Sequence, residues 1–109
     1  MSFLDGDQIA IAGESVVLRC ELSDDIWASG VLISRSIDGQ EQEMCTVNGT
    51  GQGSCTEQRF NVTSSTTMST LTVEVNLNSA DCEDTGQYFC EPVSDTSARS
   101  GIMLTAIRE

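Results

Sequence analysis

Hydrophobic and polar residues alternate along several short segments of the chain, most clearly at 15–22, 71–77 and 86–90. A period of two places every second side chain on one face of an extended strand. The residues that share such a face are Val16, Leu18, Cys20 and Leu22, then Leu71, Val73, Val75 and Leu77, then Tyr88 and Cys90. Turn residues separate the segments, and the pair Asp38-Gly39 favours a tight hairpin. The pattern predicts an all-β sandwich of two antiparallel sheets, with one short helical turn near 79–84.

The length and charge of the chain restrict what it can bind. Its 109 residues suffice for a single domain, which we place at 1–109. Seventeen acidic residues against five arginines give a net charge of -12, which repels nucleic acids and anionic membrane surfaces. No apolar run approaches the roughly 20 residues that cross a bilayer, and the start of the chain does not resemble a signal peptide. We expect a fragment of the ectodomain of a single-pass membrane protein, or alternatively of a secreted protein.

Cysteines and glycosylation sequons indicate an extracellular protein. Five cysteines in so short a chain favour an oxidising compartment. The sequons at Asn48 and Asn61 are candidate glycosylation sites and point the same way. Because Asn61 alternates with Phe60 and Val62, we expect it to point outward from its strand.

Three of the cysteines can be considered from their positions alone. Cys45 and Cys55 lie symmetrically about a stretch rich in glycine and asparagine that predicts a hairpin, so they oppose each other at disulfide distance. Position alone gives Cys82 no evident partner. Three alternatives stay open for it: an unpaired thiol without a role, a link to another chain or domain, or a bridge to Cys55.

The sequence gives little support to catalysis. Without histidine, neither a Ser-His-Asp triad nor a Cys-His pair can form, and ordinary histidine zinc sites are excluded. The acidic stretches 5–7 and 23–25 lack the ordered ligand spacing of a calcium loop, so we interpret them as solvated loops. We predict no enzymatic activity, no cofactor and no metal site.

The stretch DCEDTGQYFC at 81–90, together with SVVLRC at 15–20, resembles a V-type domain of the immunoglobulin superfamily. The resemblance covers almost the whole chain and implies a Greek-key sandwich pinned by a disulfide between Cys20 and Cys90. It also implies a tyrosine corner at Tyr88 and a salt bridge between Arg59 and Asp84.

The sequence departs from that family in two places. The family's buried tryptophan of strand C falls near Ile33, while the single tryptophan, Trp27, lies in the preceding loop. The last strand also lacks the FGxG bulge of antigen-receptor domains. A V-type domain with these departures and extra cysteines resembles the allorecognition receptors of colonial cnidarians, which implies binding to like partners on neighbouring cells.

The strand pattern also predicts a binding face. If Tyr88, Cys90, Ile33 and Leu104 point inward, then Leu32, Phe89 and Met103 share the outer face of one sheet, where they could drive association. Side chains of the strand that follows the Asp38-Gly39 turn, or a neighbouring domain, could instead cover them, or the register of the last strand could be off by one.

Two further side chains are candidate contacts for a partner. Trp27 is either an interface anchor or a plug over the top of the core. Arg99 either fixes the register of a partner or forms a surface salt bridge with Asp95.

We predict an extracellular recognition or adhesion domain that binds a protein, first of all the same receptor on another cell. Two copies of charge -12 repel each other, so homophilic contact needs local pairing of arginine with acidic side chains. One alternative is a spacer or recognition domain of a secreted innate-immune protein. Another is a sensor that takes small molecules or a metal through its acidic loops.

Overall fold

The computed structural model describes residues 2–3, 6–23 and 27–108 and consists almost entirely of strands. The strands are β1 (Ser2–Phe3), β2 (Gln8–Ile11), β3 (Val16–Leu22), β4 (Val31–Ile37), β5 (Gln40–Val47), β6 (Gly53–Cys55), β7 (Phe60–Thr67), β8 (Thr70–Leu77), β9 (Gly86–Pro92) and β10 (Ser100–Ile107). Two short 3₁₀ turns, η1 (Cys82–Asp84) and η2 (Thr96–Ala98), precede and follow β9. Among these residues, no helix is long and apolar enough to cross a bilayer.

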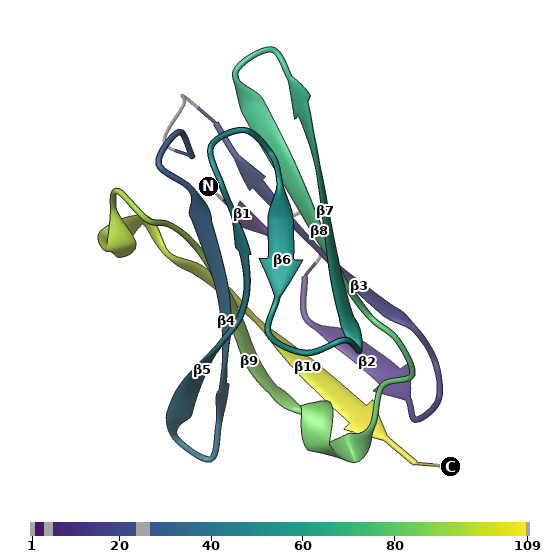
Figure 1. Cartoon of the computed structure of the whole chain (residues 1–109). Helices are drawn as coiled ribbons and strands as arrows, with labels where there is room; N and C mark the ends of the chain where they lie inside the picture. Colours follow the sequence, from purple (N-terminus) through teal and green to yellow (C-terminus); the bar gives the residue numbers. More distant parts are fainter. Residues whose placement is uncertain (1, 4–5, 24–26, 109) are drawn as a thin grey trace.

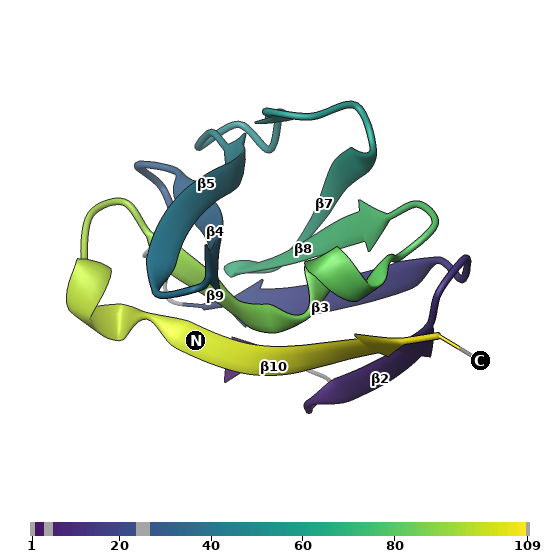
Figure 2. The same ribbon diagram turned by 90° about the horizontal axis from the view of Figure 1, so that it is seen from below.

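The strands form two layered sheets (Figures 1 and 2). One sheet has the order β1-β3-β8-β7, and the other has the order β2-β10-β9-β4-β5-β6. The prediction that both sheets are antiparallel was wrong at one edge, because β2 runs parallel to β10. Alternation shows which side chains face inward, but it does not determine the relative direction of neighbouring strands.

The core lies between the two sheets and contains the residues that the alternation placed there. The inward positions of β3, β8 and β9 are almost inaccessible to solvent: Leu18, Cys20, Leu22, Leu71, Val73, Val75, Leu77, Tyr88 and Cys90. Burial of this size is the main favourable term in folding, at about 1.5 to 3 kcal/mol for each large aliphatic side chain.

A tight turn and a bulge shape the hairpin of β4 and β5. Asp38 and Gly39 both have positive φ, 54° and 78°, as the predicted two-residue turn requires. The register between the strands shifts after Ile33, and both Met44 and Cys45 are buried at this bulge. Ile33 lies at the position where V-type domains have their buried tryptophan of strand C. It pairs with Cys45 on one side and with Cys90 on the other.

Candidate functional site

A buried ion-pair cluster closes one end of the sandwich. The Asp84 carboxylate is fully buried and accepts hydrogen bonds from Arg59 at 2.5 and 3.0 Å and from Arg35 at 3.1 Å. Burial raises the pKa of Asp84, but the hydrogen bonds from Arg59, the backbone N–H of Asp81 and Arg35 outweigh it and hold the pKa below its usual value. The structure therefore contains the predicted pair of Arg59 and Asp84.

Sequence analysis missed the second arginine of this cluster. Arg35 follows Ile33 at the inward spacing of β4, and its guanidinium lies 5.2 Å from the centre of the Phe60 ring. An arginine at an inward position needs an acidic partner, since an unpaired buried charge is costly. The alternation of β4 therefore carried the signal for Arg35.

Tyr88 joins the same cluster through its hydroxyl group. The Tyr88 hydroxyl donates a hydrogen bond of 2.5 Å to the backbone carbonyl of Asp84, as in a tyrosine corner. Burial raises the pKa of Tyr88, so the hydroxyl stays protonated as a donor.

Both predicted disulfides are present in the structure. Cys20 is bonded to Cys90 across the two sheets, and Cys45 is bonded to Cys55 on the neighbouring strands β5 and β6. The alternative bridge between Cys82 and Cys55 is therefore wrong. Cys82 is a free, partly exposed thiol in η1.

The three apolar residues predicted for the outer face of the six-stranded sheet lie there, but they do not form an open patch. Met103 is 37% exposed, while Leu32 and Phe89 are half-buried. Phe89 packs beside Gly101, where even a Cβ atom would lie 2.9 Å from the ring. Phe89 is therefore covered, but the cover comes from Arg99, between η2 and β10, and not from the side chains of β5 or a neighbouring domain as the alternative had it.

Arg99 provides that cover. Its guanidinium lies 3.9 Å from the centre of the Phe89 ring and forms an ion pair with Glu41 of β5. The expected alternative, a salt bridge with Asp95, is not what the structure contains: Asp95 caps η2 and accepts hydrogen bonds from the backbone and hydroxyl of Ser97. Arg99 thus links the two sides of the outer face across Phe89.

Of the five large apolar side chains that are exposed among the described residues, Ile9, Met103 and Ile107 lie at the edge formed by β2 and β10, while Met68 and Val93 lie apart from it, in the β7–β8 turn and after β9. Ile9 is 77% exposed and pairs with Thr105, while Ile107 is 46% exposed and pairs with the half-buried Ile11. Together with Met103, they form what we call the β2–β10 strip: Ile9, Ile11, Met103 and Ile107. Sequence analysis missed three of its members. The alternation of β10 placed Ile107 on the side of Met103, but Ile9 and Ile11 join them only through the pairing of β2 with β10, which alternation does not show.

The opposite side of the same face is acidic. Glu41 and Glu43 are exposed, and they pair with Ser36 and Ser34 on the outer side of β4. We call these two residues the β5 acidic strip. The sheet order places β9 and β4 between the two strips (Figure 2).

The position of Trp27 matches the predicted plug over the top of the core. Its ring packs against the core, and its indole N–H donates a hydrogen bond of 3.1 Å to the carbonyl of Ser69 in the turn between β7 and β8. The ring is partly buried, so this geometry favours the plug over the interface anchor.

The two sequons lie away from the β2–β10 strip. Asn48 is exposed in the turn between β5 and β6, and Asn61 is exposed on β7 between the buried Phe60 and the half-buried Val62. Both positions are accessible to a glycan, as proposed from the sequence.

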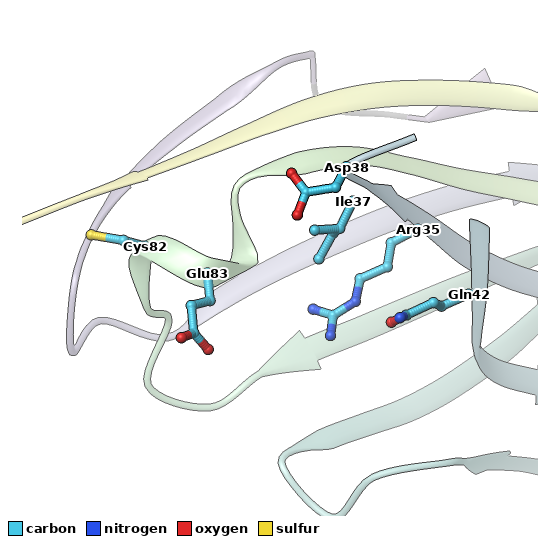
Figure 3. Close-up of a pocket in the computed structure, with 6 residues that line it drawn as sticks. All are labelled: Arg35, Ile37, Asp38, Gln42, Cys82 and Glu83. Carbon is cyan, nitrogen blue, oxygen red and sulfur yellow. The ribbon is translucent and has the colours of Figure 1, made fainter. Parts of the chain in front are cut away.

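An open pocket of about 470 Å³ lies between the β4–β5 turn and η1 (Figure 3). Its lining is Arg35, Ile37, Asp38, Gln42, Cys82 and Glu83. Arg35 is already engaged by Asp84, and the sulfur of Cys82 points away from the other labelled side chains. In the described part of the chain, no group of three or more His, Cys, Asp or Glu side chains could hold a metal ion. The acidic residues 5, 24 and 25 lie outside the described residues.

Comparison with known proteins defines the fold. No family model matches the chain, and the comparison with curated proteins finds no match. A similar solved chain comes from a photo-crosslinking study of multimeric cell-adhesive interactions of VGSC beta subunits. The TM-score is 0.74 at 19% sequence identity, and the match covers 94% of this chain and 92% of that chain. With the two sheets and the Cys20–Cys90 disulfide, this likeness shows that the chain has an immunoglobulin-like β-sandwich fold.

The contact of Arg99 with Phe89 predicts a measurable coupling. We expect a double-mutant cycle of Arg99→Ala and Phe89→Ala to give a coupling of about 0.5 to 1 kcal/mol in the free energy of unfolding, because the cation and the ring stabilise each other. Urea unfolding of the four proteins measures it. The pair Arg108→Ala and Phe89→Ala is the control, and equal coupling in both cycles would contradict the contact.

Proposed function

We propose that this chain is a V-type recognition or adhesion domain of an extracellular protein, which binds a protein partner through the outer face of its six-stranded sheet. The observation that carries the proposal is the β2–β10 strip, where Ile9 is 77% exposed and Met103 and Ile107 are also exposed. Burying a fully exposed side chain of this size is worth about 1.5 to 3 kcal/mol, and Ile9, the most exposed of the three, comes nearest to that value. Exposed apolar groups gathered on one face mark interaction sites more often than chance exposure.

Three further observations support this assignment. The similar chain belongs to a study of multimeric cell-adhesive interactions, which is the class of activity proposed here. The two disulfides and the exposed sequons at Asn48 and Asn61 suit an extracellular glycoprotein anchored by a single membrane span. Glycans at these two positions would leave the β2–β10 strip free for a partner.

A glycan placed on the strip tests the proposed face. Met103→Asn creates a sequon with Thr105, and Ser65→Asn creates one with Thr67 on the exposed side of β7, in the other sheet. A tetramer of the domain is screened against an array of extracellular proteins from its own organism, and occupancy of each new sequon is verified by mass.

We expect Met103→Asn to reduce binding to a hit at least about tenfold, because a bulky sugar keeps the two surfaces apart. Ser65→Asn carries the same added sugar and should bind as the parent does. Binding that survives the glycan at position 103 contradicts the proposed face. A tetramer that binds no protein on the array favours the spacer alternative.

The nature of the partner depends on charge. Homophilic binding, and with it self/non-self recognition of the cnidarian type, depends on arginines that can meet acidic side chains of a second copy. The availability of those arginines therefore distinguishes a like partner from an unlike one.

A further inference from the structure

Every arginine of the chain is engaged within the molecule. The pairs are Arg19 with Glu74, Arg35 and Arg59 with Asp84, Arg99 with Glu41, and Arg108 with Asp81. The sequence has neither lysine nor histidine, so these five are its full set of cationic side chains. An acidic group of a partner therefore has to share an arginine with an acidic group of this chain, as Asp84 and Glu57 already share Arg35.

Only Arg99, among the described residues, brings a cationic side chain to the outer face of the six-stranded sheet. Arg35 points into the sandwich, where its side chain is 11% exposed, and Arg19 belongs to β3 of the other sheet. Arg99 is held twice, by Glu41 and by the ring of Phe89. The face therefore presents the apolar β2–β10 strip and the β5 acidic strip, with its single cation occupied.

A second copy of this chain cannot pair favourably with the β2–β10 strip and with the β5 acidic strip at the same time. In a symmetric face-to-face dimer whose two-fold axis runs along the strands, each β5 acidic strip meets the apolar strip of the other copy. If the axis runs across the strands, apolar meets apolar, but acidic then meets acidic. In either arrangement the second copy brings no cation to Glu43, and Glu41 keeps only Arg99 of its own chain. The net charge of -12 adds repulsion at long range.

We propose that the partner is a different protein, whose surface carries an apolar patch opposite the β2–β10 strip and lysine or arginine side chains opposite Glu41 and Glu43. This inference rests on the proposed function and replaces the homophilic partner predicted from the sequence. Opposite charges steer such a pair together, so the association is fast at low salt and slows as salt screens the charges.

A charge-reversed copy of the domain is a defined probe for this partner. The double variant Glu41→Lys with Glu43→Lys keeps the β2–β10 strip and makes the β5 strip basic. The matched control, Glu21→Lys with Glu74→Lys, changes the net charge equally on β3 and β8 of the other sheet. Each protein is coupled to beads, since many weak contacts between beads add up to a visible aggregate.

We expect beads with the parent domain to remain dispersed alone and to aggregate with beads that carry Glu41→Lys and Glu43→Lys. That aggregation should fall severalfold between about 50 and 500 mM salt, as the screening length shortens. Parent beads mixed with control beads should remain dispersed, because the basic groups of the control lie on the wrong sheet.

Three results would overturn the inference. Parent beads that aggregate alone, and lose this when they carry the glycan at position 103, would show homophilic binding through the same face and leave the proposed function intact. Equal aggregation of parent beads with control beads would show that net charge alone, and not the position of the lysines, causes the aggregation. Failure to aggregate with the basic probe would show that the two strips do not act together. By contrast, a protein from the array that binds equally well when position 103 carries the glycan contradicts the proposed face itself.

Discussion

Asp84→Asn should cost about 3 to 5 kcal/mol in the free energy of unfolding, measured by urea denaturation. The carboxylate is fully buried and forms ion pairs with Arg59 and Arg35. It also accepts a hydrogen bond from the backbone N–H of Asp81, the residue just before η1. A neutral amide leaves Arg59 without its carboxylate and leaves Arg35 only its longer ion pair with Glu57, at 3.7 Å.

Asp38→Asn is the control for Asp84→Asn, since it makes the same chemical change at an exposed turn. Asparagine tolerates the positive φ of this position, so we expect an effect within about 0.5 kcal/mol. If Asp84→Asn costs no more than Asp38→Asn, the ion-pair cluster does not stabilise the fold as argued.

The same cluster predicts how stability depends on pH. The pKa of Asp84 is lower in the folded protein than in the unfolded chain, where it is about 3.9. Folding therefore gains stability from this group above about pH 4, and loses it as the pH falls through the folded pKa, because the unfolded state binds the proton first. Urea midpoints measured down to acid pH should fall more steeply in the parent than in Asp84→Asn.

Part of the end of the domain that contains Asp84 was predictable from sequence, because the stretch 81–90 resembles a known motif, although Arg59 and Arg35 lie 25 and 49 residues from Asp84. Asp84 and Tyr88 lie within the stretch 81–90, and its resemblance to a V-type domain implied both the tyrosine corner and the salt bridge with Arg59. Arg35 was missed, although its inward position on β4 was implied by alternation. An inward charge in a strand otherwise apolar on that side is a signal for a buried ion pair.

The outer face was harder to predict, because it depends on long-range pairing. The alternation of side chains alone placed Leu32, Phe89 and Met103 on the outer face of one sheet, and this prediction was correct. It could not show that Arg99 extends across Phe89 to Glu41, 58 residues away in sequence. Nor could it show that β2 joins β10 in parallel and brings Ile9 beside Met103 and Ile107.

Removing the Cys20–Cys90 disulfide by paired alanine substitution should cost more than removing Cys45–Cys55. The two bonds close loops of 70 and 10 residues. Loop-closure entropy then gives about 4 kcal/mol for the first and about 3 kcal/mol for the second. The first pair also lies in the centre of the core, at 2% and 0% exposure, so alanine leaves a cavity there as well.

The combined variant tests whether the two disulfides act independently. Ile33 pairs with Cys90 on one side and with Cys45 on the other, so each disulfide packs against the strand that the other supports. Residues that share a neighbour are rarely additive, and we expect a deviation of at least about 0.5 kcal/mol from the sum of the two single removals. Urea unfolding of the three variants, with free thiols counted by mass, measures it. A larger loss from the short loop than from the long one would mean that the sheets are not held chiefly through Cys20 and Cys90.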